Sequence, residues 1–339
     1  MISTKEALIA TRPTHHVPVM LDEVLGGLAP APGFVVADGT LGTAGHGVAF
    51  LRALHGAGVF VGLDRDPDML EIARGRIMDL FDAEPELATT RVILAAEPYE
   101  NLGRVLAREG LSGADAILLD LGFNSLQVDD PERGFSFTND GPLDGRYNAS
   151  DPKCRTIAQL VNEAAELDLA DWIRLYGDER YARAIARRIV ARRERQPFER
   201  TADLAEVIST GYPVKERYRS HIHPATRSFQ ALRLVANDEL GGVKRGIANC
   251  LGALAPGGRL AVIAYHSGED RIAKALFDEA GAPKADPSNP YAATTTAGLN
   301  FELDRRSSAK PSAAEVVRNP RARSARLRLI RRRIAGGDQ

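Results

Sequence analysis

The feature that most constrains the fold is an apolar run that ends at an acid and enters a glycine-rich turn. The run ends at Asp38, glycines follow at 39, 42, 45 and 47, and an amphipathic stretch continues through 48–54. This pattern is typical of a parallel strand that leads into a helix around a nucleotide-like ligand. The glycine spacing matches neither the dinucleotide fingerprint nor the P-loop, so both of those common interpretations are weakened.

Five short apolar runs, including this one, are predicted to form buried strands: 34–38, 59–63, 91–94, 114–119 and 259–265. The first four alternate with helical patterns at the spacing of βαβ units, which predicts a mostly parallel sheet covered on both faces. Asp66 and Pro67 are typical of an N-cap and a first helical residue, so a helix is expected from there to about Leu80. The predicted fold class is α/β.

The long segment between the fourth and fifth strands has helical patterns in place of strands, at 156–163, 168–176, 178–195 and 201–210. Asp178 is expected to cap the third of these helices. We interpret the segment as a helical insertion domain that interrupts a discontinuous sheet domain. The expected bounds are 141–224 for the insertion and 15–140 with 225–339 for the sheet domain.

The ends of the chain and one linker complete this outline. A long helix is expected at 225–254, and the tail at 325–334 is expected to add a final edge strand. Residues 1–14 are expected to be disordered. The segment 283–298 is rich in Pro, Ala, Ser and Thr, so a mobile linker is expected there.

Cysteine usage and hydropathy limit the class of protein. Cys154 and Cys250 are too few for a disulfide framework or a metal cluster, which indicates a reducing compartment. Neither a secretion signal nor an apolar run long enough to span a membrane is visible. The sequence therefore predicts a cytoplasmic protein that binds neither a metal nor a membrane.

Ligands of open parallel sheets bind at the strand ends, and four acids are expected there: Asp38, Asp64, Asp115 just before the fourth strand, and Asp120 just after it. A dinucleotide brings negative phosphates, whereas a sulfonium cofactor brings a positive centre. One carboxylate at ~4 Å from such a centre contributes roughly 4 kcal/mol at an effective dielectric near 20. The acids therefore favour S-adenosylmethionine (SAM) over NAD. Asp64 stands where an acid binds ribose hydroxyls, and its alternative role is to form the turn that Asp66 caps.

Several polar or aromatic residues beside these acids each have two interpretations. His46 either contacts the amino-acid part of the cofactor or bonds within its turn. Asp120, Phe123 and Asn124 provide a carboxylate, a stacking ring and an amide, which are groups suited to holding an exocyclic amine on a base. The structural alternative makes Phe123 a core residue and Asn124 a turn residue. His266 is a candidate substrate residue or, alternatively, a core or turn histidine.

Motifs spread along the chain carry a family resemblance. The chain resembles the MraW (RsmH) family of 16S rRNA cytosine-N4 methyltransferases, whose motifs occur here in the family's order. The matching stretches are 16–23, 38–46, 64–67, 119–122, 132–137, 140–144, 223–227, 229–233, 266–267, 269–271 and 319–324.

The resemblance implies a class I SAM-dependent methyltransferase, with a Rossmann-like sheet and an inserted helical domain for substrate recognition. It implies methylation of N4 of a cytosine in the decoding region of 16S rRNA, within the small ribosomal subunit. A homodimer is left open. The SAM contacts that it implies are Ala44, Gly45, His46, Asp64, Tyr99, Asp120 and Gln127.

The chain also departs from the family's pattern. Ala44 replaces a glycine, and 123–126 replaces a small-Ser-Ser-Pro sequence. Gly145 and Tyr147 replace methionines, and Gly268 replaces a leucine. Most of these departures border the expected substrate side, so the methyl donor is better specified than the target base.

The remaining expectations concern RNA and the reaction. Arginines are concentrated in the tail and in the helix predicted at 178–195. The tail residues Arg321, Arg323 and Arg326 are expected to contact RNA. For the helix, RNA contact and a solvent-exposed face without a ligand are equally expected. Direct methyl transfer is expected, with Asp120, Asn124 and His266 as candidate catalytic residues. The alternatives are a methyltransferase for another substrate, a SAM-binding RNA or assembly factor with weak or altered activity, and an NAD-dependent oxidoreductase.

Overall fold

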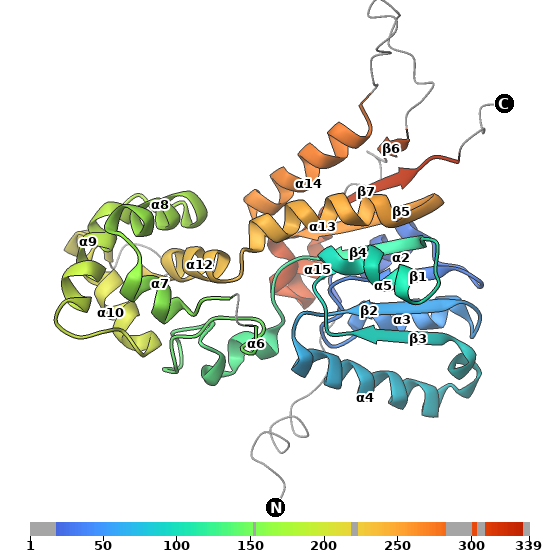
Figure 1. Cartoon of the computed structure of the whole chain (residues 1–339), viewed down its shortest axis with the longest axis horizontal. Coiled ribbons are helices and arrows are strands. Elements are labelled where there is room, and N and C mark those ends of the chain that lie inside the picture. The colour runs from blue at the N-terminus through green and yellow to red at the C-terminus, as the bar shows by residue number, and fades with distance from the viewer. Residues whose placement is uncertain (1–17, 152–153, 218–222, 283–299, 304–308, 335–339) are drawn as a thin grey trace, which may run out of the picture. The chain divides into compact units, whose positions relative to one another are not determined.

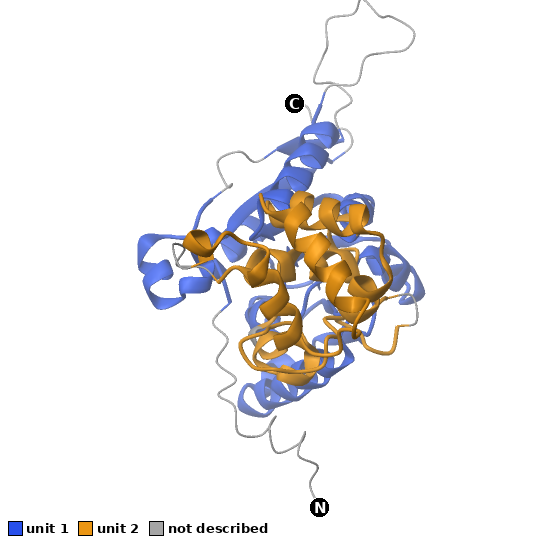
Figure 2. Ribbon diagram, turned by 90° about the vertical axis from the view of Figure 1, so that its left-hand side faces the viewer, with its two compact units in different colours: residues 1–122, 242–339 blue, residues 123–241 orange. Residues whose placement is uncertain are grey.

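The computed structural model describes residues 18–151, 154–217, 223–282, 300–303 and 309–334. The chain folds into two compact units (Figure 2). The sheet unit combines Met1–Gly122 with Gly242–Gln339, and the helical unit is Phe123–Gly241. The segments predicted to be disordered or mobile, 1–14 and 283–298, lie outside the described residues.

A seven-stranded sheet organises the sheet unit (Figure 1). Its order is β3-β2-β1-β4-β5-β7-β6, and β1 to β5 are parallel. This arrangement confirms the α/β class I fold. The strands are β1 (Val35–Asp38), β2 (Val59–Leu63), β3 (Arg91–Ala95), β4 (Ala114–Asp120), β5 (Leu254–Ala264), β6 (Phe301–Leu303) and β7 (Arg326–Arg332).

The predicted edge strand needs a correction. The tail does form a strand, β7, but β7 pairs antiparallel with β5 on one side and with β6 on the other. The edge is therefore β6, a segment whose three residues are too short to stand out as a strand pattern. The fifth predicted strand is also longer than expected, because β5 begins at Leu254.

Strand residues alternate between two cores, as expected of a sheet that is covered on both faces. In β4, Leu118 faces one core and Leu119 the other. Helices α2, α3 and α4 contribute to the first core, and α5, α13 and α14 to the second (Figure 1). Their bounds are α2 (Leu21–Leu28), α3 (Gly45–Leu54), α4 (Pro67–Ala83), α5 (Leu102–Arg108), α13 (Glu239–Ala253) and α14 (Ser267–Ala280).

Helix starts show why these segments fold locally as they do. Asp66 caps α4 by accepting a hydrogen bond from the backbone N–H of Asp68 at 3.1 Å, and Pro67 is the first helical residue, which confirms that prediction. Four short elements complete the sheet unit: η1 (Pro85–Thr89), η2 (Tyr99–Asn101) and, in the tail, α15 (Ala313–Arg318) followed by η4 (Pro320–Ser324).

The helical unit has a core of its own, formed by apolar residues from Leu143 to Ala236. It begins before the expected boundary at 141, and α12 belongs to it, because Leu232 and Phe229 of α12 share this core. Its helices are α6 (Ser125–Asp129), η3 (Pro131–Arg133), α7 (Ile157–Glu163), α8 (Glu166–Gly177), α9 (Ala182–Arg193), α10 (Thr201–Thr210), α11 (Val214–Arg217) and α12 (Ala225–Ala236).

Two helix predictions in this region were wrong. Asp178 does not cap α9; it ends α8 in the left-handed region, with φ 49°, and α9 begins only at Ala182. The long helix at 225–254 is two helices, since Asp238 has φ 45° and breaks the helical path. Asn237 stabilises the break by accepting from the N–H of Tyr147 at 2.9 Å and donating to the carbonyl of Gly145 at 2.8 Å.

Among the described residues, no helix is both long and apolar enough to cross a membrane.

Candidate functional site

Three of the four predicted acids lie at the carboxyl edge of the sheet. Asp38 and Asp120 are the last residues of the neighbouring strands β1 and β4, and Asp64 directly follows β2. The prediction for Asp115 was wrong. Asp115 is the second residue of β4, where its carboxylate accepts from the N–H of Val35 at 2.8 Å and ties the starts of β1 and β4 together.

These three carboxyl groups are unusually hard to ionise. Desolvation by burial is the largest cause, and it raises the pKa of Asp38 and Asp120 to about 7 and that of Asp64 to about 6. Like charges add to the effect, Asp64 acting on Asp38 and Asp38 on Asp120. A positively charged ligand at this edge would favour ionisation of all three groups.

Asp64 holds the glycine-rich turn. Its Oδ2 accepts from the N–H of Gly42 at 2.8 Å, and its Oδ1 accepts from the N–H of Asp66 at 2.9 Å. Asp66 itself caps α4. These contacts agree with the interpretation of Asp64 as a turn residue. A ligand hydroxyl that bound Asp64 would share its two carboxylate oxygens with these backbone N–H groups.

Asp120 is fixed from two sides. Its N–H donates to Oγ1 of Thr40 at 2.6 Å, and the hydroxyl of Tyr265 donates to its Oδ1 at 2.8 Å. Tyr265 directly follows β5 and is a residue that sequence reasoning missed. Its position next to His266, at the end of an apolar strand, was the available signal.

His46 is buried beside Asp120 at the start of α3. Its Nε2 lies 3.0 Å from the carbonyl oxygen of Val19, which can only accept, so Nε2 carries a proton. The other ring nitrogen, Nδ1, lies 3.7 Å from Oδ2 of Asp120.

The remaining residues expected at the cofactor lie in the turn and around it. Ala44 is fully buried and has φ 61°, a conformation that favours glycine, and Gly45 begins α3 after it. The ring of Tyr99 packs against α13, because a Cβ on Gly246 would lie 2.2 Å from two of its atoms.

His266 is the N-cap of α14. Its Nδ1 accepts from the N–H of Gly268 at 3.1 Å, while Oε2 of Glu269 accepts from the N–H groups of Tyr265 and His266, each at 3.0 Å. The turn interpretation of His266 thus accounts for these contacts. Gly268, one of the departures from the family pattern, supplies the backbone donor.

In the helical unit, Asn124 and Gln127 form a capping box at the start of α6. Oδ1 of Asn124 accepts from the N–H of Leu126 at 3.0 Å, and Oε1 of Gln127 accepts from the N–H of Asn124 at 2.9 Å. This geometry matches the turn interpretation of Asn124. The oxygen of each side chain therefore already stabilises the local backbone.

Phe123 is not a core residue, so that alternative is wrong. Its side chain is 48% exposed, and the guanidinium of Arg233 lies over its ring at 4.4 Å from the centroid. Arg233 is in turn held by Glu239 through two hydrogen bonds, from Nε at 2.7 Å and from Nη2 at 3.1 Å. An exposed aromatic face with a fixed cation behind it is suited to stacking.

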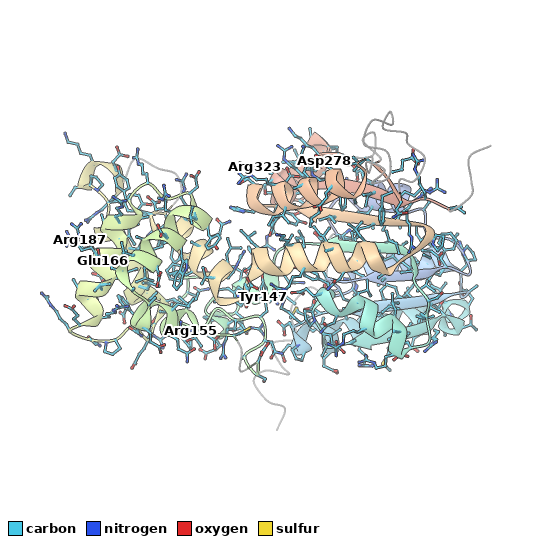
Figure 3. The ribbon with its side chains drawn as sticks, turned by 45° about the horizontal axis from the view of Figure 1, so that its top comes forward. Tyr147, Arg155, Glu166, Arg187, Asp278 and Arg323 are labelled. Atoms are coloured by element: carbon cyan, nitrogen blue, oxygen red, sulfur yellow. The ribbon has the colours of Figure 1, made fainter. Side chains whose placement is uncertain are left out.

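The tail arginines are not equivalent. Arg328 makes a two-bond ion pair with Asp270, and Arg326 lies 4.0 Å from the same carboxylate. Arg321 and Arg323 are exposed on η4. Figure 3 labels Arg323 in the sheet unit and Arg187 on α9 of the helical unit. Arg183, Arg187 and Arg188 of α9 are likewise exposed.

In the portion of the chain that the structure describes, no group of three or more His, Cys, Asp or Glu side chains is arranged to hold a metal ion.

Comparison with known proteins decides the family. The profile described as the MraW methylase family matches residues 13–333. The chain belongs to this family. A ribosomal RNA small subunit methyltransferase H from Acidothermus cellulolyticus is 44% identical over 316 residues, which is 92% of each chain. The enzyme of that name from Geobacter sulfurreducens is 44% identical over 313 residues, 92% of this chain and 97% of that one.

Family membership confirms the resemblance that the sequence motifs indicated. Membership of this family agrees with the observed strand order. It confirms the prediction that the protein is a class I methyltransferase with SAM as its methyl donor.

Proposed function

We propose that this protein transfers a methyl group from SAM to N4 of a cytosine in 16S rRNA of the small ribosomal subunit, at position 1402 in customary rRNA numbering. One observation carries the proposal. The family match spans 13–333, and relatives named for small-subunit rRNA methylation align over more than nine tenths of this chain.

The donor set at the carboxyl edge fits the methyl donor. When bound, SAM supplies an electrophilic methyl group on a positively charged sulfur. Asp38 and Asp120 provide negative charge that desolvation makes costly without a cation nearby. Asp64 would hold ribose hydroxyls, Ala44 to His46 would face the methionine end, and Tyr99 and Gln127 complete the proposed set.

The proposed substrate residues are of types suited to the demands of the target amine. The lone pair of a cytosine amine is delocalised into the ring, so the site must orient the amine and favour the cationic product. Asp120 and Asn124 would accept hydrogen bonds from it, and His266 is a further substrate-side candidate. Extruding the base costs a few kcal/mol, and stacking on Phe123 can return about 1–3 kcal/mol.

We assign recognition of the RNA backbone to exposed arginines. Arg321, Arg323 and Arg326 of the tail would contact phosphates, and the helical unit would contribute to substrate recognition. Each phosphate contact to a single strand lowers the slope of log affinity against log salt by about 0.7.

A second candidate is a SAM-binding RNA or assembly factor with weak or altered methyltransferase activity. The observation that favours it is the capping box at α6, where the oxygens of Asn124 and Gln127 are engaged with the backbone.

Mass spectrometry of small-subunit RNA tests the proposal. Subunits that lack the modification are incubated with the protein and SAM, digested, and compared with subunits incubated with Asp120→Asn. The expected result is a gain of one methyl group on a single cytosine, with N4-methylcytidine among the nucleosides. SAM binding without any methyl transfer would support the assembly factor instead, and methylation of another nucleotide would overturn the assigned target.

A further inference from the structure

Tyr265 touches Asp120, and neither the family pattern used above nor the proposed SAM contacts assign it a role. We propose that Tyr265 is a positioning residue for methyl transfer: its hydroxyl fixes one oxygen of Asp120, so that the other oxygen can accept the amine proton. This inference rests on the proposed function, since it names the proton acceptor of that reaction.

The geometry leaves one carboxylate oxygen for chemistry. The hydroxyl of Tyr265 donates to Oδ1 at 2.8 Å, and the backbone of Asp120 is held by Thr40 at 2.6 Å. With Oδ1 engaged, Oδ2 faces Nδ1 of His46 at 3.7 Å. The proton that leaves the amine would therefore arrive at Oδ2, with the imidazole of His46 as its nearest neighbour.

The charges around Asp120 explain why such a donor is needed. Asp38 at the end of β1 and Glu269 on α14 both disfavour its ionisation, in addition to desolvation. The hydroxyl of Tyr265 acts in the opposite direction, because a hydrogen bond donated to a carboxylate favours the charged form. His46 on α3 is the one neighbour among these that can carry positive charge.

Tyr265 is suited to remain a donor. Burial, together with Asp120, Glu269 and Glu315 of α15, holds the pKa of its hydroxyl well above the usual value. It therefore does not release its own proton where Asp120 titrates, and it works through Asp120 without touching the reacting atoms.

The reaction moves one methyl group and one proton. A bond forms between N4 and the methyl carbon as the carbon–sulfur bond breaks, and that electron pair stays on sulfur. N4 becomes positively charged and loses one proton to Oδ2 of Asp120, while the N–H electron pair returns to nitrogen. A carboxylate that is already protonated cannot accept, so the rate should follow the ionisation of Asp120.

Proton release on SAM binding tests the inference without RNA. Calorimetry in buffers of different ionisation enthalpy, between pH 5.5 and 9, gives the number of protons released in wild type, Tyr265→Phe and Asp120→Asn. Subtracting the Asp120→Asn curve gives the contribution of Asp120 together with its coupling to Asp38. In Tyr265→Phe the midpoint of that difference should rise by about one pH unit.

Methylation gives the second readout. At neutral pH, Tyr265→Phe should lower kcat about fivefold with KM for RNA within about twofold, and raising the pH by about one unit should restore most of the rate. Tyr176→Phe, which removes a phenol hydroxyl on α8, is the matched control and should leave both pH profiles unchanged.

Two results would overturn the inference: an unmoved midpoint in Tyr265→Phe, or a loss of rate that no pH restores. If Tyr265→Phe fails to fold, 3-fluorotyrosine at position 265 serves instead, since its more acidic hydroxyl should move the midpoint down. Proton release that behaves as expected without methylation of ribosomal RNA would reject the proposed function and leave the role of Tyr265 standing.

Discussion

At the scale of single residues, the site is dominated by carboxyl groups held in unfavourable surroundings. Asp38 is 1% exposed and lies within reach of two other acids whose pKa values are also raised. A group with a raised pKa stabilises the fold fully below its unfolded value, near 4, and that contribution is lost as the pH rises through about 7. Above that pH the ionised acids therefore lower the stability of the unliganded protein, and a bound cationic ligand would offset this loss.

SAM affinity should consequently depend on pH. Because a positive ligand binds best when the acids are ionised, the dissociation constant should increase on the order of tenfold between pH 8 and pH 6. Calorimetric titrations across this range measure the effect. In Asp38→Asn the dependence should be shallower, and the unliganded variant should be more stable at pH 8 by roughly 1–3 kcal/mol; affinity that does not vary with pH would contradict the electrostatic account.

Phe123 provides a second prediction at this scale. Phe123→Ala should raise KM for the RNA by about 5- to 100-fold, as expected for the loss of one stacked base, while leaving SAM affinity unchanged. Phe123→Tyr should retain most of the function. Leu175→Ala, which removes another exposed apolar side chain (64% exposed), is the control for a general surface effect.

At the scale of elements, helix boundaries could be predicted where neighbouring residues in the sequence determine them, and could not where residues distant in the sequence do. The start of α4 could be predicted because Asp66 and Pro67 act on the adjoining backbone. The break between α12 and α13 could not, since Asn237 is fixed by Gly145 and Tyr147, far away in the chain. Tyr265 escaped notice for the same reason, because its partner Asp120 lies on another strand.

Gly145, a departure from the family pattern, is required by the close approach of Ile157 at the start of α7. It has φ 74°, and a Cβ there would lie 2.4 Å from Cδ1 of Ile157. Gly145→Ala should therefore destabilise the protein by roughly 1–3 kcal/mol. Gly26→Ala in α2, where a Cβ meets nothing within 4 Å, should instead stabilise by about 0.5–1 kcal/mol. Thermal unfolding of both variants measures the contrast, and similar melting temperatures would refute it.

At the scale of the whole molecule, each unit carries its own arginine surface. The sheet unit presents Arg321 and Arg323, and the helical unit presents Arg187 and Arg188. The fold class and the acids of the carboxyl edge could be predicted because parallel strands bring their ends to one edge. Which arginines are exposed could not, since ion pairs such as Arg328 with Asp270 join segments distant in sequence.

Salt dependence distinguishes the two surfaces. Arg321→Gln with Arg323→Gln should make the slope of log affinity for RNA against log salt shallower by about 1.4, at about 0.7 per phosphate. The pair Arg187→Gln with Arg188→Gln tests α9 in the same assay. Filter binding from low to moderate salt measures both slopes. If the tail variant has the wild-type slope, the tail arginines do not contact RNA phosphates.

The order of the strands has a consequence for synthesis on the ribosome. β4 pairs with β5, yet the whole helical unit is translated between them. At cellular translation rates β4 waits on the order of 10 s for its neighbour. During that interval the helical unit can assemble its own core, while an apolar strand edge stays unpaired and open to aggregation. The nascent chain therefore has its greatest need of chaperones just before β5 emerges.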